Sequence, residues 1–409
     1  MRELFAPLTP AEDKYLPNAK RDGGLCLALS GGGFRATLFH LGALRRLNEL
    51  GLLSSFKSIS SVSGGSMIAL CLADGIISVP PEPGKPLQNF ESIAAKARDL
   101  VSFNLRRTVM LKKLLPWNSL TSLPELVAKE MADRVSTRTL VDLPDTPRFI
   151  FCATDLVFGS NWVYEKTRAG NYEAGYKRSE LQSIRLAYAA AASACFPPVF
   201  KPMKPEIDGK DLKDGDATGP EADECRSKIR LTDGGVYDNM GLEPLWKNAE
   251  SLIVSDAGGT FEYSPNRGTL SDLKRYPDIM GNQARALRKR WLISSFITGD
   301  GPGGLPGLSG TYFATTSDVT RYNPDLKLGY SSGVALKIAQ IRTDLDRFSD
   351  AEQAVLQNHG YLLCDIALKT HLPDLYQSAP PIDIPFKEWM DEKKVLEAIR
   401  NSAKQRLLP

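Results

Sequence analysis

The chain has 409 residues, of which 42% are hydrophobic and 24% are charged. These fractions are ordinary for a soluble globular protein and exclude the disordered and fibrous classes. The length predicts two domains or one large, elaborated domain. The formal net charge of +3 is nearly balanced, so it argues neither for nor against an anionic partner.

Three observations bear on cell compartment and metals. The first 22 residues carry charges and prolines without a continuous apolar run, which predicts a polar lead-in rather than a secretory signal. No apolar run in the chain reaches the roughly 18 residues needed to span a bilayer, so we expect any membrane contact to be peripheral. The six cysteines are widely spaced, without a CxxC pair. This spacing favours reduced thiols in a cytoplasmic protein over disulfides or a metal site.

Short apolar strands alternate with helical patterns from residue 23 onward. Strands are predicted at 25–29, 56–60, 148–153, 229–232 and 251–255. Helices are predicted at 36–50, 65–74, 91–103, 120–133, 179–192, 241–248, 349–369 and 386–405. This alternation predicts an α/β fold in which helices cover both faces of a parallel sheet.

Two hydrophilic segments interrupt the alternation. Residues 201–228 form an insertion whose acidic run, 208–216, lacks the spacing of a calcium-binding EF-hand loop, so a solvated loop is predicted. Residues 299–307 are rich in glycine and proline. They predict either a mobile loop or lid, or a plain surface linker.

The first predicted strand ends in the glycine-rich run 30–35, Ser-Gly-Gly-Gly-Phe-Arg. Gly31, Gly33 and Ala36 match the dinucleotide-binding spacing, which makes a nucleotide-binding module one interpretation. The next strand ends in serines, however, whereas that motif requires an acidic residue to bind the ribose. A Walker A loop is excluded because no Lys-Ser/Thr pair follows the glycines.

An oxyanion hole is the alternative interpretation of this turn. Three consecutive glycines, Gly31, Gly32 and Gly33, can adopt conformations that leave their backbone N–H groups bare. Such donors stabilise the negative charge that develops on a carbonyl oxygen. Arg35 adds a cation that could help to position this segment, hold a phosphate or carboxylate of a substrate, or form an ordinary surface ion pair.

The second predicted strand ends at Ser63, in the sequence Ser-Val-Ser-Gly-Gly. A nucleophile elbow places a serine on a sharp strand-to-helix turn, with small residues two positions before and after it. Ser61 and Gly65 occupy those positions. The N-terminus of the following helix would favour negative charge near the serine. Ser63 is therefore the predicted nucleophile.

The chain contains three histidines, His40, His359 and His371, and no catalytic motif surrounds any of them. A Ser-His-Asp triad therefore has no support in the sequence, and a carboxylate is the more promising base. The best candidate is Asp233, which follows a short apolar run.

Asp233 precedes Gly234 and Gly235, which would let the chain approach a neighbouring strand closely. The competing interpretation of this sequence is a simple Asp-Gly turn. Asp155 and Asp256 also follow strands and are less specific rivals for the base. Asp238 and Asn239 are expected to cap the next helix or brace the loop.

Taken in order, Ser-Gly-Gly-Gly-Phe-Arg, Ser-Val-Ser-Gly-Gly and Asp-Gly-Gly resemble the motifs of the patatin-like phospholipase family. The resemblance covers about residues 23–260, and the small-residue segment 189–200 supports it. Ser61 and Ala36 stand where the family more often has glycine, and neither departure removes a reacting group.

The resemblance implies a three-layer α/β/α sandwich with a mostly parallel central sheet. It also implies a Ser63–Asp233 dyad that needs neither histidine nor calcium, and no cofactor. The implied activity is hydrolysis of acyl esters, of the phospholipase A or lysophospholipase type, on phospholipids or other lipids at a membrane surface. A nucleic acid polymer is not an expected partner.

We expect three segments: a polar lead-in over 1–22, a catalytic core over 23–260, and an extension over 261–409 with a loop or lid and helices packed on the core. The extension is similar to the C-terminal part of bacterial members. Some of those are effectors switched on by a cyclic nucleotide in antiphage defence, which implies a cyclic nucleotide as a candidate activator. A catalytically silent storage or scaffold protein is the remaining alternative.

Two stretches, 105–117 and 285–293, mix cations with large apolar residues as membrane-surface segments do. Ordinary surface helices with one buried face explain both equally well. A regulatory anion pocket is a third interpretation.

Overall fold

The computed structural model describes residues 21–197, 199–261, 269–298, 307–323 and 328–404, with the side chains of 269–274 left out. The predicted lead-in lies almost entirely outside the described residues, and so does the glycine-rich segment 299–306. Within these ranges, no helix is both long and apolar enough to cross a membrane.

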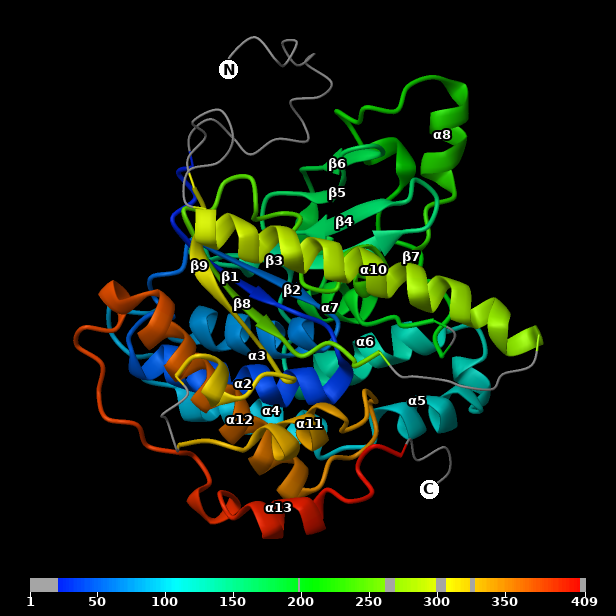
Figure 1. The fold of residues 1–409 in the computed structure, drawn as a ribbon. Coiled ribbons are helices and arrows are strands. Elements are labelled where there is room, and N and C mark those ends of the chain that lie inside the picture. The colour runs from blue at the N-terminus through cyan, green and yellow to red at the C-terminus, as the bar shows by residue number, and fades with distance from the viewer. Residues whose placement is uncertain (1–20, 198, 262–268, 299–306, 324–327, 405–409) are drawn as a thin grey trace.

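One mixed sheet of nine strands runs through the described part of the chain, in the order β6-β5-β4-β3-β2-β1-β8-β9, with β7 paired to β3 (Figure 1). Five neighbouring strands are parallel: β1 (Leu25–Leu29), β2 (Ser58–Val62), β3 (Arg148–Asp155), β8 (Ser251–Asp256) and β9 (Ser309–Ala314). Four strands are antiparallel to their neighbours: β4 (Ser160–Tyr164), β5 (Ala169–Asn171), β6 (Gly175–Lys177) and β7 (Leu231–Asp233).

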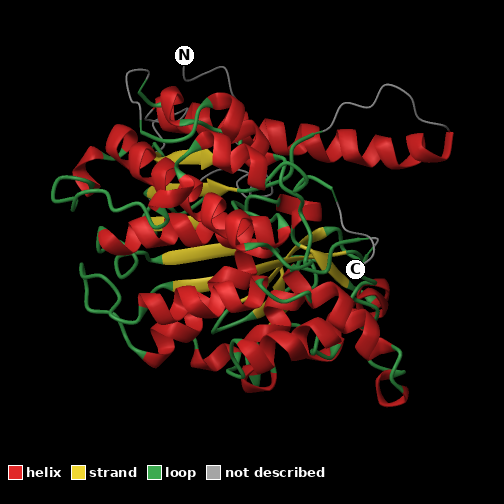
Figure 2. Ribbon diagram, turned by 90° about the horizontal axis from the view of Figure 1, so that it is seen from below, coloured by secondary structure: helices red, strands yellow, loops and turns green. Residues whose placement is uncertain are grey.

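Helices cover both faces of the sheet, so the strands lie between two helical layers (Figure 2). One face carries α2 (Gly33–Glu49), α3 (Gly64–Ser78), α4 (Phe90–Val101), α5 (Leu105–Lys113), α6 (Leu123–Arg134), α7 (Leu186–Ser193), α11 (Ser332–Ala339), α12 (Asp350–His371) and α13 (Glu392–Ala398). The long helix α10 (Thr269–Thr298) crosses the other face (Figure 1). The smaller helices are α8 (Pro220–Ser227) and α9 (Gly235–Asp238).

Successive side chains of a strand point to opposite faces of the sheet, so each face has its own hydrophobic core. Leu27 and Leu29 of β1 point into the larger core, whereas Cys26 and Ala28 point into the smaller core beneath α10. The apolar runs that predicted parallel strands are thus buried on both sides. The predicted α/β sandwich is confirmed. All six cysteines are free, and five of them are buried.

The C-terminal part of the chain is built into the same layers. Helix α12 packs closely on α2, where a Cβ added at Gly42 would lie 1.9 Å from the Gln357 carbonyl oxygen and one at Gly360 would lie 1.9 Å from that of Phe39. Strand β9 extends the sheet beyond β8. The sequence analysis expected a loop and helices here and missed this strand.

Several predicted helices differ from the structure. The predicted helix 241–248 consists of turns, the predicted helix 179–192 is limited to α7, and the predicted helix 386–405 is limited to α13 with a 3-10 turn before it. The 241–248 segment carries Pro244, which cannot donate a backbone hydrogen bond. Its apolar residues, Leu242 and Leu245, instead pack under α10 in the smaller core.

Candidate active site

The register of the sheet brings the ends of β2 and β7 together. Strand β2 runs parallel to β3 and its last pair is Val62 with Cys152. Strand β7 runs antiparallel to β3 and ends with Asp233 opposite Ala153. Because β4 occupies the other edge of β3 at this level, β2 and β7 share one edge and meet end to end. Ser63 and Asp233 therefore lie at adjacent positions along β3.

Ser63 sits on a strained turn. Its backbone has φ 52° and ψ −118°, a region that costs a non-glycine residue about 1–3 kcal/mol. It stands at the N-cap of α3, and its side chain accepts no capping hydrogen bond. The residue is 8% exposed, so only a small part of it faces the adjoining cavity. This is the backbone that a nucleophile elbow requires.

Buried serines hold the turn from behind. The Ser63 N–H donates to Ser193 Oγ at 2.9 Å, and the Ser193 hydroxyl donates to the Cys152 carbonyl at 2.6 Å. Ser66 Oγ lies 2.8 Å from Ser193 Oγ and 3.0 Å from Ser61 Oγ. Ser61 stands where the family that the sequence resembles more often has glycine. Its hydroxyl thus anchors the turn.

Asp233 is buried beside the serine. Its Oδ1 accepts a 2.7 Å hydrogen bond from the Gly235 N–H, whereas its buried Oδ2 has no partner of regular hydrogen-bond geometry among the described residues. Burial raises the pKa of Asp233 to about 6, against the lowering effects of Ser63 and the Gly235 N–H. A carboxylate with a pKa near neutrality and a free oxygen is suited to accept a proton.

The glycines around the pair permit close approach. A Cβ added at Gly65 would lie 2.3 Å from the Leu29 carbonyl oxygen, and one at Gly234 would lie 2.3 Å from that of Cys152. A Cβ at Gly64 would lie 2.0 Å from the Gly33 carbonyl oxygen. The nucleophile turn and the first glycine turn are therefore in direct backbone contact.

Two of the three predicted oxyanion donors are available. The Gly31 N–H donates to the Asn239 carbonyl at 3.0 Å, so it is already engaged. The N–H groups of Gly32 and Gly33 have no acceptor among the described residues, and both residues have positive φ, 151° and 58°. The sequence predicts three N–H donors for the oxyanion. In the structure only two of them, those of Gly32 and Gly33, are without an acceptor among the described residues.

Arg35 does not face the cavity. Its side chain is buried and donates to three backbone carbonyls, those of Ala257, Ala339 and Ile341, at 2.7–2.9 Å. Burial lowers the pKa of Arg35 to about 10. The expectation that it could hold a substrate phosphate is therefore corrected. Arg35 instead ties the glycine turn to the C-terminal part of the chain, which agrees with a role in positioning that segment.

The rival bases lie elsewhere. Asp256 pairs with Arg285 at 2.8 Å and accepts from the Tyr312 hydroxyl, and these partners hold its pKa well below the usual range. Asp155 accepts from the Val157 N–H and the Asn171 amide. Neither residue is among those that line the cavity at Ser63.

Two of the three histidines, His40 and His359, are buried in the core, and His371 is exposed. His40 bonds Ser255 and the Ser30 carbonyl, and His359 bonds the Thr315 carbonyl. Burial lowers the pKa of both to about 4. His371 contacts Thr311. No histidine lines the cavity at Ser63.

Asp238 and Asn239 brace the loop rather than a helix. Asp238 accepts hydrogen bonds from the N–H groups of Met240, Leu242 and Glu243. The Asn239 carbonyl receives the Gly31 N–H, and its amide lies 3.5 Å from the Gly31 carbonyl. The second of the two predicted roles for this pair is thus observed.

The reacting groups open into a cavity of about 570 Å³. Its wall includes Ser63, Asp233 and the three glycines, together with Phe196, Val199 and Val236. Residues from the C-terminal part, 343–345, also line it, as do arginines of α5 and α10. Such a volume is typical of a small-molecule or lipid-chain site with apolar walls and a few placed polar groups.

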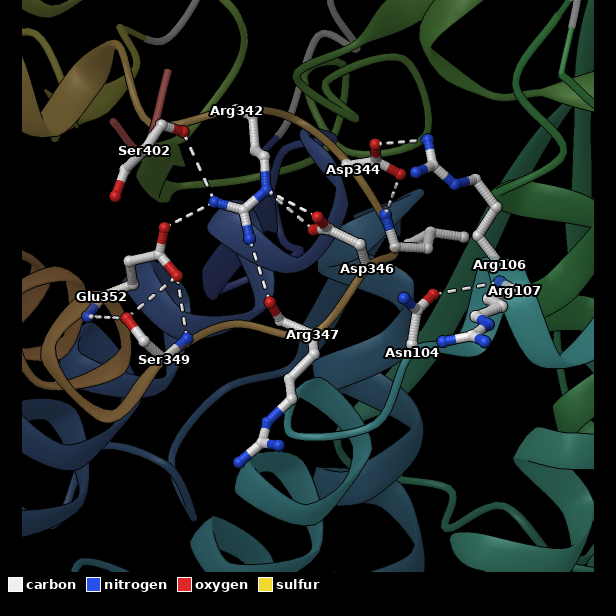
Figure 3. A network of polar contacts seen from close by, with 11 residues as sticks. Asn104, Arg106, Arg107, Arg342, Asp344, Asp346, Arg347, Ser349, Glu352 and Ser402 are labelled. Carbon is white, nitrogen blue, oxygen red and sulfur yellow. Dashed lines mark hydrogen bonds and ion pairs between the residues drawn. The ribbon is translucent and has the colours of Figure 1, made fainter. Parts of the chain in front are cut away.

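The sequence did not predict that Asp344 contacts the glycine turn. Its carbonyl accepts the Phe34 N–H at 3.0 Å, and a Cβ at Gly33 would lie 2.8 Å from the same oxygen. The segment that carries it is braced by Arg342, whose buried guanidinium bonds Asp346 and Glu352 (Figure 3). No local motif marks this contact, because it joins residues about 300 positions apart.

Similarity to individual known proteins is low. No curated protein matches the sequence. Among solved structures, VipD from Legionella pneumophila has a TM-score of 0.35 at 14% identity, covering 92% of this chain and 74% of its own. Human GIVD cytosolic phospholipase A2 has a TM-score of 0.45 at 13% identity, covering 96% of this chain and 61% of its own.

The family comparison is more decisive. The model of the patatin-like phospholipase family matches residues 27–246, more than half of the chain, and includes both glycine turns and Asp233. The matched region ends before β8, β9 and α12, which complete the sheet and its helical cover. The chain belongs to the patatin-like phospholipase family of lipid hydrolases.

Proposed function

We propose that the protein is a serine lipid acyl hydrolase that cleaves carboxylic esters of phospholipids, in the manner of a phospholipase A or lysophospholipase. Ser63 is the nucleophile and Asp233 is its base. The N–H groups of Gly32 and Gly33 receive the oxyanion. Catalysis by these residues is our inference, supported by the family membership and by their arrangement in one cavity.

The reaction proceeds in two steps through an acyl-serine. Asp233 Oδ2 accepts the Ser63 proton as Ser63 Oγ attacks the ester carbonyl, and the carbonyl oxygen becomes an oxyanion between Gly32 and Gly33. The protonated Asp233 then gives its proton to the departing alcohol. In the second step Asp233 accepts a proton from water, which attacks the carbonyl carbon of the acyl-serine. As the bond to Ser63 Oγ breaks, Asp233 returns this proton to Ser63 Oγ and the fatty acid is released.

The observation that carries this proposal is the end-to-end meeting of β2 and β7 on β3. It puts a serine with φ 52° next to a buried carboxylate whose Oδ2 is unpartnered among the described residues. Both groups line the same cavity as the two bare glycine N–H groups. A nucleotide-binding interpretation of the glycine turn accounts for none of this pairing.

The test is release of fatty acid from phospholipid vesicles by the wild type, Ser63→Ala and Asp233→Asn, together with labelling by a fluorophosphonate probe. We expect both substitutions to lower the rate by at least about 10³-fold and Ser63→Ala to abolish labelling. The matched control is Ser227→Ala, at an exposed hydroxyl in the 201–228 insertion.

Each alternative has its own outcome in this experiment. If the folded wild type is not labelled and releases no fatty acid, the hydrolase is refuted and a catalytically silent storage or scaffold protein is indicated. Nucleotide binding without esterase activity, unchanged in Ser63→Ala, would indicate the nucleotide-binding module. Near-normal activity of Asp233→Asn would refute the dyad.

We extend the proposal to regulation through the C-terminal part, because Asp344 contacts the glycine turn directly. An activating ligand that bound residues 261–409 could therefore act on the oxyanion donors. Addition of cyclic nucleotides to the vesicle assay tests whether the chain is an effector of that kind. A rate that is unchanged at millimolar cyclic nucleotide would contradict it.

A further inference from the structure

The segment after α5 exposes an unusual set of large apolar side chains. We call residues 110–120 the apolar loop; it includes the end of α5 and the 3-10 turn η1 (Pro116–Asn118). Leu114, Trp117 and Leu120 are 79%, 76% and 99% exposed. Met110, Leu111 and Leu115 are exposed as well. Single exposed apolar residues need no explanation, whereas a contiguous group on one loop marks an interaction site.

The apolar loop is held in shape by polar contacts from beneath. Lys113 Nζ donates to the carbonyls of Asn118, Ser119 and Thr121, at 3.3, 2.7 and 2.8 Å. The Asn118 amide donates to the Lys112 carbonyl at 2.9 Å. These side-chain bonds fix several carbonyls of the loop, while its large apolar side chains remain exposed.

The apolar loop continues from a helix that reaches the cavity. Arg106, in the same helix α5, lines the cavity and bonds Asp344 at 2.6 Å (Figure 3). Other exposed apolar residues are themselves part of the cavity lining: Phe196, Val199, Val236 and Phe261. Exposed apolar side chains therefore occur both on the apolar loop and in the lining of the cavity.

The charge of the region fits an anionic surface. Residues 102–122 contain two arginines and two lysines and no carboxylate. Arg106 pairs with Asp344 and Lys112 with Glu130, whereas Arg107 and Lys113 have no carboxylate partner among the described residues. The side chain of Arg107 is exposed. The second basic stretch, 285–293, differs: Arg285 pairs with Asp256 and Arg288 with Asp238 and Glu243. Two of its four cations are therefore paired within the fold, and Leu292 on the same stretch is buried.

We propose that the apolar loop inserts into the surface of an anionic phospholipid bilayer and holds the cavity mouth against it. Leucine and tryptophan side chains with adjacent cations are the combination that partitions into the headgroup region. The inference rests on the proposed function in one respect, because a lipid substrate has to leave the bilayer to reach Ser63.

The test measures binding and catalysis separately. Binding of the full chain to vesicles of phosphatidylcholine with 30% phosphatidylglycerol is followed by flotation in the Ser63→Ala background, where no lipid is consumed. Compared with this parent, the added Leu114→Ser/Trp117→Ser/Leu120→Ser substitutions are expected to weaken binding by about 100-fold or more, since three large side chains no longer enter the bilayer. The matched control is Leu396→Ser, at an exposed leucine of α13.

Charge is tested with the same vesicles. We expect pure phosphatidylcholine, or high salt, to weaken binding by about 30-fold, because Arg107 and Lys113 would contribute roughly 1 kcal/mol each to binding an anionic surface. Emission from Trp117 supplies a direct signal: the blue shift on adding vesicles is expected to shrink in Trp117→Phe.

Failure of this inference is distinguishable from failure of the proposed function. The three substituted residues do not line the cavity, so with Ser63 intact the triple variant should hydrolyse a soluble short-chain ester within about twofold of wild type. Vesicle binding unchanged by the triple substitution would overturn docking by the apolar loop and leave the hydrolase intact. Concentration-dependent self-association lost in the triple variant, without any vesicle binding, would assign the loop to a protein interface instead.

Discussion

The two turns that form the candidate site are supported in different ways. The nucleophile turn at Ser63 is held by hydroxyls of Ser61, Ser66 and Ser193, all within the region that the family model matches. The glycine turn is held largely from outside that region, by Asp344 and by Arg35, whose guanidinium reaches carbonyls at 257, 339 and 341.

This difference separates two tasks in one reaction. The attacking group is fixed by its own strand and its neighbours. In the proposed mechanism the oxyanion donors, Gly32 and Gly33, depend on a distant part of the chain, so we expect changes there to alter the rate without moving the nucleophile. Only interactions stronger in the transition state than in the ground state accelerate the chemistry, and the oxyanion donors are of that kind.

The largest expected effect comes from forcing the two turns apart. In Gly64→Ala the new Cβ would lie 2.0 Å from the Gly33 carbonyl oxygen, a backbone atom that cannot rotate away. We expect kcat to fall about 10³-fold or more, because nucleophile and donors both move. Gly333→Ala in α11 is the control, since its Cβ would meet nothing within 4 Å. Near-normal turnover by Gly64→Ala would show that the turns need not touch.

Removing the long-range support alone should have a smaller effect. Arg35→Met leaves three buried carbonyls without their donor, and we expect kcat to fall about 10²-fold with little change in KM. Arg178→Met, at an exposed cation, controls for loss of charge. If stability measured by urea unfolding falls while kcat holds, Arg35 supports the fold and not the oxyanion donors.

The pH dependence reports on the nucleophile side. Asp233 must be ionised to act as a base, and its pKa of about 6 predicts that kcat/KM rises about tenfold from pH 5 to pH 7. A pH profile between 4 and 8 measures this limb. A rate that is flat from pH 5 to 7 would contradict Asp233 as the titrating base.

The same raised pKa has the opposite sign for stability. The folded state resists ionisation of Asp233, so the wild type loses stability as pH rises from about 4 to about 6. Asp233→Asn should therefore be more stable than wild type at pH 7, by up to about 3 kcal/mol, and equal to it near pH 4. Urea unfolding of both proteins at pH 4 and pH 7 measures this difference in the free energy of unfolding.

We expect the smallest loss of kcat from a substitution at Ser193, which supports the turn that carries Ser63. Ser193→Ala removes one hydrogen-bond acceptor of the Ser63 N–H, which is worth about 1 kcal/mol and hence about fivefold in kcat. Fluorophosphonate labelling should slow in proportion. A loss as large as that of Arg35→Met would mean that both turns depend equally on their supports.

Much of this arrangement could be predicted from local sequence. The apolar runs predicted the parallel strands, and small residues around Ser63 and Asp233 marked the turns because close backbone approach demands them. Long-range contacts carry no such mark. Asp344 reaches Phe34 through a backbone carbonyl, and any residue type could supply that group.

The orientation of β7 in the sheet could not be predicted from the sequence either. A three-residue strand reads the same whether it runs parallel or antiparallel, yet only the antiparallel pairing with β3 brings Asp233 to the end of β2. The sequence could not choose between the roles considered for Arg35, because its burial and its three backbone carbonyl partners are visible only in the structure.

The segment between Met203 and Leu231 suggests how this scaffold can be re-engineered. These two residues form an isolated antiparallel bridge, with N–H to carbonyl hydrogen bonds of 2.9 and 2.7 Å. The intervening residues are anchored as well, because Leu212 and Ile229 are buried in the larger core and Lys213 pairs with Tyr176. A foreign loop is therefore best inserted at the exposed Gly219, where an added Cβ would meet nothing within 4 Å, so that these anchors and the register of β7 are kept.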